Sequence, residues 1–195
     1  MDIYNLTLTF FPYNLEYVKD KFISAIGAEY NVYHIDEYDG LLNEYYIQLY
    51  NAPKVQFILF APKCNPHTTI MYANIIDGYV NLIKYASEKC GMEYYNILIS
   101  DGKSQMMEAY HFHYYSPSQV RHVLCYKDPQ WVFYEEGEPL GVEQVENYKS
   151  RLKKKRLNKD IILQYLNHLG WDIMDENLWH TDNVIYEFVQ TTPHI

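Results

Sequence analysis

Four side chains of the types that hold transition metals stand at two places in the sequence. Cys64 and His67 form a Cys-x-x-His turn, and His111 and His113 are two residues apart in an aromatic run. Residues two apart on a strand point to the same face of a sheet, so both imidazoles could reach one ion. The Cys-x-x-His spacing also occurs in zinc sites. This set predicts a metal-dependent hydrolase as the alternative function. The competing interpretation is that His111 and His113 are ordinary histidines on the solvated face of a strand, in a chain without a cofactor.

Nucleophilic catalysis finds little support in the sequence. Cys125 and His122 are three residues apart on an expected strand, which points them to opposite faces and argues against a dyad. The chain has no G-x-S-x-G motif, and the turn at residues 100–103 lacks the glycine spacing of a phosphate-binding loop. We therefore expect no acyl- or phosphoryl-transfer site.

Acidic side chains stand beside aromatic ones after residue 130. Five acids and no base lie between Glu135 and Glu146. Aromatic side chains anchor protein interfaces and carboxylates steer basic partners, so this stretch favours docking onto an Arg/Lys-rich protein surface. A solvated hairpin followed by a helix start is the competing interpretation. The residues predicted to bind the partner are Trp131, Tyr134, Glu135, Glu136 and Glu138, with Asp36, Glu37 and Asp39 as a second group.

The charge balance agrees with a basic partner and argues against a nucleic acid. The chain of 195 residues has a formal net charge of −9, yet seven of its sixteen bases lie within residues 149–159, where no acid occurs. The acidic remainder would repel phosphates. We expect the short basic run to pair within the molecule. The 22 tyrosines favour a recognition surface, since Tyr has an apolar ring and a polar tip, although an AT-rich coding sequence would also produce them.

Cysteine use and the N-terminal residues predict a cytoplasmic protein. Three widely spaced cysteines without a C-x-x-C motif do not suit a disulfide framework. The first eighteen residues contain acids but no base, unlike a secretory signal. The longest apolar stretches fall well short of the roughly 20 residues that span a bilayer. We therefore expect no membrane association, while the oligomeric state stays open.

The hydrophobic periodicity predicts a single α+β domain over residues 1–195. Its largely antiparallel sheet would carry packed helices and a helical C-terminal segment at 141–182. Alternating residues predict strands at 3–10, 30–35, 45–50, 54–61, 94–99, 106–115, 119–126, 131–134 and 184–189. The strand at 54–61 should be central, the three strands between residues 30 and 61 should form a meander, and the last strand should lie at an edge. Helical stripes predict helices at 15–26, 69–90, 142–156 and 159–169.

Several short motifs cover about a third of the chain towards its C-terminus. They are Lys127-Asp128-Pro129-x-Trp131-x-Phe133, Gly137-x-x-Leu140, Tyr148-x-x-Arg151 and Leu169-Gly170-Trp171-Asp172-Ile173 with Trp179. Together they resemble small uncharacterised bacterial proteins from toxin–immunity neighbourhoods. No catalytic motif defines those proteins, so no functional residue is carried over. The resemblance implies a cytosolic immunity protein, and we expect a non-enzymatic protein that neutralises a bacterial toxin by occluding its basic active-site surface.

Overall fold

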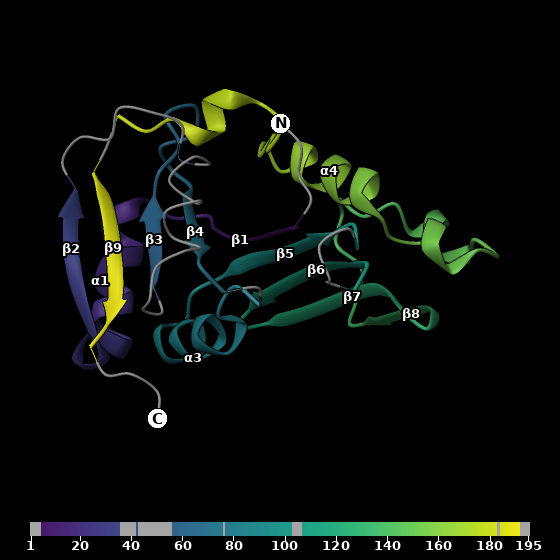
Figure 1. The fold of residues 1–195 in the computed structure, drawn as a ribbon, viewed down its shortest axis with the longest axis horizontal. Helices are drawn as coiled ribbons and strands as arrows, with labels where there is room; N and C mark the ends of the chain where they lie inside the picture. The colour runs from purple at the N-terminus through teal and green to yellow at the C-terminus, as the bar shows by residue number, and fades with distance from the viewer. Residues whose placement is uncertain are drawn as a thin grey trace.

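Nine antiparallel strands of the described chain form one twisted sheet at the centre of the molecule (Figure 1). The structure, a computed structural model, describes residues 5–35, 42, 56–75, 77–102, 107–182 and 184–191. The order of the strands is β2-β9-β3-β4-β1-β5-β6-β7-β8. Their bounds are β1 (Asn5–Phe11), β2 (Tyr30–Ile35), β3 (Gln56–Phe60), β4 (Thr69–Ala73), β5 (Tyr94–Ser100), β6 (Ala109–Ser116), β7 (Gln119–Asp128), β8 (Gln130–Glu136) and β9 (Ile185–Gln190). The α+β class with an antiparallel sheet is confirmed.

Both faces of the sheet are covered, and each has its own hydrophobic core. The helices α1 (Leu15–Ile26) and α3 (Val80–Cys90) lie on one side, which we call the α3 face. The helix α4 (Lys159–His168) lies on the other side, the α4 face. Successive residues of a strand point to opposite faces, so Phe10 joins the core under α4 while Phe11 joins the core under α1.

Helices α1 and α4 begin where their sequences predict. The side chains of Asn14 and Asn158 accept hydrogen bonds from the backbone N–H groups of Tyr17 and Ile161, which would otherwise lack partners in the first helical turn. Gly170 follows α4 with a φ of 81°, a conformation in which glycine avoids the clash of a side chain.

The expected helix at 69–90 is wrong in its first half. Residues Thr69–Ala73 form β4, and all five are buried between β1 and β3. A strand that is buried on both faces has no polar positions, so its run of apolar residues resembles a helical stripe. The helix α3 begins only at Val80, after Gly78 and Tyr79, which both have a φ of 61°. A side chain at position 78 would clash with Thr7 on β1, so the glycine permits a close approach to the sheet.

The expected helix at 142–156 is also wrong. This stretch holds two short 3₁₀ turns, η2 (Val145–Lys149) and η3 (Lys153–Lys155). Glu143 lies before them with its side chain fully buried, because it pairs with Arg121 instead of facing solvent on a helix. Between residues 141 and 182 the structure contains one α-helix, α4, and a further 3₁₀ turn, η4 (Glu176–Trp179). The C-terminal segment is thus only partly helical.

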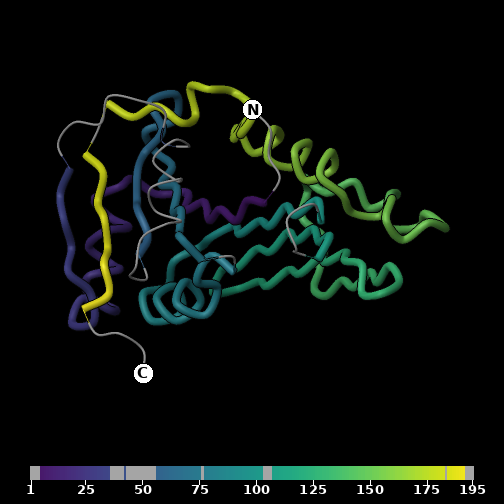
Figure 2. The backbone as a smooth tube through the Cα atoms, viewed as in Figure 1, coloured from purple at the N-terminus to yellow at the C-terminus, as the bar shows by residue number. Residues whose placement is uncertain are grey.

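Strand β9 is an interior strand and not the expected edge strand. It pairs with β2 on one side and β3 on the other, so β2 and β3 are not neighbours, unlike two strands of a simple meander. Figure 2 shows the chain passing from α4 across the molecule to reach this position (yellow). The buried side chain of Phe188 stacks on Phe57 with ring centroids 4.6 Å apart, which explains why β9 prefers the interior. Strand β3 is an interior strand, in line with its apolar sequence, while the expected strand at 45–50 lies outside the described residues.

Candidate functional site

Strand β8 lies at the edge of the sheet and carries most of the residues predicted to bind a partner. We call the exposed residues Tyr134, Glu135, Glu136 and Glu138 the acidic edge. Tyr134 keeps 49% of its surface exposed and donates a hydrogen bond to Glu136. Both lie on the α3 face, because they are paired across strands with Leu124 and His122. Glu135 lies on the opposite face, so the acidic edge wraps around the rim of the sheet.

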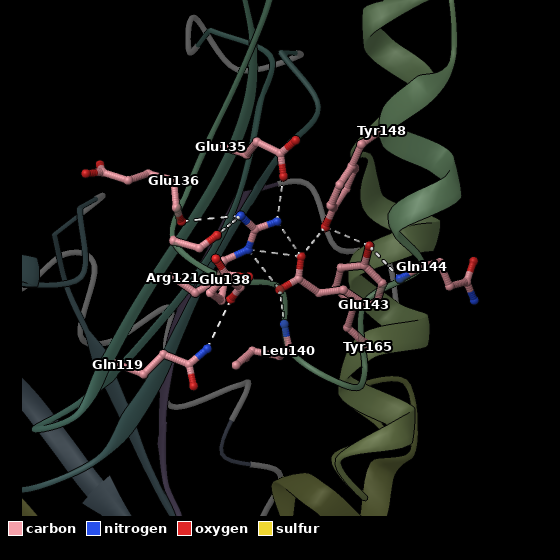
Figure 3. Close-up of polar contacts among 11 residues, drawn as sticks. Gln119, Arg121, Glu135, Glu136, Glu138, Leu140, Glu143, Gln144, Tyr148 and Tyr165 are labelled. Carbon is pink, nitrogen blue, oxygen red and sulfur yellow. Dashed lines mark hydrogen bonds and ion pairs between the residues drawn. The ribbon is translucent and has the colours of Figure 1, made fainter.

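Glu135 belongs to a buried network around Arg121 that the sequence analysis missed (Figure 3). The Arg121 side chain is only 1% exposed. Its guanidinium donates to the carboxylate of Glu143 through Nε and Nη2, and Nη2 also lies 2.7 Å from Glu135 Oε2. Nη1 donates to the backbone carbonyl of Gly137 at 2.8 Å. Every nitrogen of the guanidinium therefore has an acceptor.

Two tyrosines complete this arginine network from the C-terminal segment. Tyr148 donates to Glu143 Oε2 at 2.6 Å, and its hydroxyl lies 3.0 Å from that of Tyr165 on α4. Burial alone would lower the pKa of Arg121, but the hydrogen bonds that it donates to Glu143 and Glu135 outweigh this effect and raise the pKa, so the guanidinium stays charged. Burial raises the pKa of Tyr148, and its bond to Glu143 raises it further. The network fastens the segment after β8 to the sheet.

One pattern in the sequence indicated that Arg121 would be buried and paired. Arg121, Val123 and Cys125 alternate along an expected strand, which places Arg121 on the same face as two apolar residues. A charged residue in such a row must be paired when it is buried. What the sequence could not supply was the partner, because Glu143 lies 22 residues away in a stretch that reads as the start of a helix.

Trp131 stands apart from the acidic edge. It packs on the core of the α4 face, where its ring stacks on Tyr110 with centroids 6.4 Å apart. It also lines a shallow cavity of about 400 Å³ together with basic residues of the run at 149–159, which are Arg151, Lys153 and Lys154. The structure therefore places Trp131 beside positive charge at one end of β8 and the acidic edge at the other end. The second predicted group, Asp36, Glu37 and Asp39, lies outside the described residues.

His111 and His113 converge with a third histidine, His122, in what we call the histidine cluster. The ligand nitrogens of the three rings all lie within 4.8 Å of one another. His113 Nδ1 and His122 Nδ1 are 2.7 Å apart, and His113 Nε2 lies 3.0 Å from the hydroxyl of Tyr94. His113 is buried, while His111 and His122 are partly exposed. The cluster sits on the α3 face of β6 and β7.

The hairpin between β6 and β7 creates this convergence. Ser116 pairs with Gln119 across a two-residue turn, so the register places His122 directly opposite His113. Serine and proline at the predicted turn could have revealed this pairing, since counting back three residues on each side reaches the two histidines. The spacing that defined the sequence motif, two residues along one strand, could not.

The three imidazoles are held in their uncharged form. Burial, together with the neighbouring His122 and His111, lowers the pKa of His113 to about 3. Burial, together with His122, lowers the pKa of His111 to about 4. Burial also lowers the pKa of His122, against the opposing effect of Glu136. The unprotonated ring nitrogens are therefore free to accept a proton donor or a metal ion.

Cys64 and His67 do not join the histidine cluster. Both are exposed in the connection between β3 and β4, and strands β1 and β5 separate β4 from β6. Three strand spacings of about 4.8 Å each divide the two halves of the predicted metal set. The proposed hydrolase site of four ligands is therefore not brought together. Cys125 faces the α4 side, away from His122, and burial raises the pKa of its thiol to about 11, as expected for a cysteine outside any catalytic dyad.

Comparison with known proteins found no matching family model, no similar curated protein and no similar solved structure. Within the described residues, no helix is both long and apolar enough to cross a membrane.

Proposed function

We propose that the chain is a non-enzymatic acidic binding protein, an immunity protein of the cytoplasm that neutralises a bacterial toxin by occluding its basic active-site surface. The observation that supports this most is the exposure of Tyr134, Glu136 and Glu138 at the rim of an edge strand. Carboxylates steer a basic partner from a distance, and an exposed tyrosine provides contact area with little loss of side-chain freedom.

The carboxylates of the acidic edge are not equally available. Glu135 is paired with Arg121. Among the described residues, none pairs with the carboxylate of Glu138, and only Tyr134 donates to that of Glu136. Glu136 and Glu138 should therefore contribute most to the attraction. The arginine network beneath them holds the strand and the following turn in place, so the partner would meet a surface that is already ordered.

Trp131 is less suited to a basic partner than the sequence indicated. A cationic surface that covered this tryptophan would meet Arg151, Lys153 and Lys154 around the same cavity. Like charges across an interface are unfavourable. We therefore centre the proposed interface on Tyr134, Glu136 and Glu138, with Glu135 at its margin.

The first test is the genomic neighbourhood of the coding sequence, where we expect a gene for a large secreted protein that ends in a basic toxin domain. Co-expression with that domain should rescue growth, and the two proteins should bind with an affinity that falls as salt rises. The double variant Glu136→Gln/Glu138→Gln should bind about tenfold more slowly, since steering accelerates association by roughly 10- to 1,000-fold.

A matched control is the variant Glu29→Gln/Glu176→Gln, which removes the same charge from exposed positions outside the acidic edge. It should leave the association rate nearly unchanged. If both double variants slowed association equally, the overall charge of the protein, and not the acidic edge, would account for the attraction. Absence of a neighbouring toxin gene, or binding that does not respond to salt, would contradict the proposal.

A further inference from the structure

We propose that His111, His113 and His122 bind a divalent transition-metal ion with the coordination chemistry of Zn²⁺ on the α3 face of the sheet. This inference goes beyond the proposed docking function and does not depend on it. It rests on the convergence of three imidazoles from two neighbouring strands, whose ligand nitrogens lie within 4.8 Å of one another.

The spacing of the ligand nitrogens of His113 and His122 suits one ion after a small adjustment. A tetrahedral zinc ion with Zn–N bonds of about 2.05 Å holds two ligand nitrogens about 3.3 Å apart. His113 Nδ1 and His122 Nδ1 are 2.7 Å apart, as in a hydrogen bond in which one ring donates its proton to the other. Replacing the shared proton by a metal requires the two rings to separate by only about half an ångström.

Tyr94 provides the second bond that a metal-binding histidine needs. Its hydroxyl lies 3.0 Å from Nε2 of His113, the nitrogen that points away from His122. When Nε2 carries the proton and donates it to this hydroxyl, Nδ1 keeps a free lone pair for the ion. Such outer contacts fix the orientation and tautomer of ligand histidines. Tyr94 is fully buried, so it holds the ring from a fixed position.

The cluster is better satisfied with an ion than without one. Among the described residues, His111 has ring contacts with His113 and His122 but no hydrogen-bond partner. Its ring stays uncharged, so it offers a lone pair that the protein itself leaves unused. A metal ion would engage all three rings at once, whereas the single proton between His113 and His122 engages two.

The surroundings admit a cation and leave room for a fourth ligand. The charged groups that influence the pKa values of the rings are Lys84 on α3 and Glu136 on β8. Lys84 is exposed, and its Nζ lies 3.8 Å from Oε1 of Glu88. The partly exposed His111 and His122 leave one side open. Three protein ligands with a water in the fourth position are one of the arrangements in which proteins hold zinc. Imidazole ligands favour zinc, nickel or copper over magnesium or calcium.

The test uses the full chain after treatment with chelator, titrated with Co²⁺ and followed by visible absorption, with Zn²⁺ as the competitor. We expect one ion per chain and the intense absorption of a low-coordinate Co²⁺ site, which Zn²⁺ removes. Tyr94→Phe keeps the packing but removes the outer contact, and should weaken binding by roughly tenfold to a hundredfold. His122→Ala removes a direct ligand and should weaken it more than Tyr94→Phe does.

Two controls keep the result specific to the cluster. The double variant Cys64→Ser/His67→Ala changes the exposed pair that the sequence linked to metal binding, and His168→Ala changes an exposed histidine on α4. Both should bind Co²⁺ like the parent chain. Circular dichroism establishes that each variant is folded, and His111→Gln, at a partly exposed position, replaces His122→Ala if that variant unfolds.

Failure of the folded parent chain to bind one equivalent of Co²⁺ or Zn²⁺ at micromolar concentration would overturn the inference. Binding that survives loss of His122 or His111, or that disappears in the Cys64→Ser/His67→Ala variant, would also overturn it. None of these outcomes bears on toxin binding, which is measured with a different partner and different variants.

Discussion

Two neighbouring residues of β7 occupy opposite faces of the sheet and meet opposite surroundings. Arg121 points to the α4 face, where Glu143, Glu135 and backbone carbonyls satisfy its guanidinium. His122 points to the α3 face, where its nearest polar partner is another histidine. The buried guanidinium of Arg121 is fully compensated and stays charged, while the partly exposed imidazole of His122 lies against other histidines and stays neutral.

This difference separates a structural role from a candidate binding role. A buried charge whose every donor is used has no capacity for a ligand, and its contribution is to hold the segment after β8 on the sheet. A group of imidazoles with unused lone pairs has that capacity and contributes less to folding. Perturbed pKa values occur on both faces, so a pKa shift alone does not distinguish a structural group from a candidate ligand. The two are distinguished by whether the hydrogen-bonding atoms of the group already have partners.

The largest effect is expected on the α4 face. Glu143→Ala leaves Arg121 without its main counter-charge and should lower the free energy of unfolding by about 3–5 kcal/mol, as measured by urea denaturation. The double variant Arg121→Met/Glu143→Leu replaces the pair by apolar side chains and should be less destabilised than the single variant. A loss below about 1 kcal/mol for Glu143→Ala would show that the network is not structural.

A somewhat smaller loss is expected at the turn that carries an acceptor of Arg121. Gly137 has a φ of 82°, and a side chain there would clash with the carbonyl oxygen of Val120. Gly137→Ala should therefore cost more than the 1–2 kcal/mol of a left-handed non-glycine residue. Gly170→Ala is the matched control, because its φ is 81° but no atom lies within 4 Å of the added carbon. If the two variants lost equal free energy of unfolding in urea, the turn at Gly137 would have adjusted to the added side chain while Arg121 kept its acceptor.

The α3 face should respond to pH where the α4 face does not. In the chelator-treated protein, the pKa values of the three histidines lie below the ordinary value of about 6.5, so the unfolded state binds protons first as the pH falls. Stability is then fully present above pH 6.5 and decreases towards pH 4. Each additional proton bound by the unfolded state contributes about 1.4 kcal/mol per pH unit.

Thermal unfolding between pH 5 and 6.5 measures this effect, since the ordinary pKa values of carboxylates, near 4, lie below that window. His122→Gln should reduce the slope. A slope that is the same in this variant and in the parent chain would place the titration elsewhere in the molecule.

The smallest effect on stability is expected at the rim between the two faces. Tyr134→Phe removes an exposed hydrogen bond to Glu136, and its stability should stay within about 0.5 kcal/mol of the parent chain. Its affinity for a basic toxin domain should nevertheless decrease, because the hydroxyl would lie in the proposed interface. Unfolding and binding measured on the same preparation separate the two roles. A clear loss of stability would make Tyr134 part of the fold.

Sequence patterns predicted those helices and strands whose capping residues or alternation lie within the element itself. The helix α1 follows from Asn14 and its buried stripe, and the strands β6 and β7 follow from alternation around residues 116–118. The strand β4 was misread because burial on both faces removes the alternation that identifies a strand. The interior place of β9 depends on pairing with strands more than 120 residues away, which no local pattern encodes.

The sequence predicted only part of the candidate site, for the same reason. His111 and His113 were found from their spacing on one strand, but His122 joins them through the register of a hairpin. Cys64 and His67 were grouped with them by residue type alone, and the strand order separates the two pairs. The acidic edge could be predicted from the local composition of the sequence. The pairing of Glu135 with Arg121 could be found only from the folded structure.

The interior place of β9 has a consequence for the order of folding during synthesis. Strand β2 pairs with β9, and β9 leaves the ribosome only after the other eight strands of the described sheet. Until residues 185–190 emerge, β3 presents an apolar edge and β2 has no described neighbour to pair with, which is the condition under which nascent chains associate wrongly. A premature stop before Ile185 would therefore produce an aggregating protein and not a slightly shortened one.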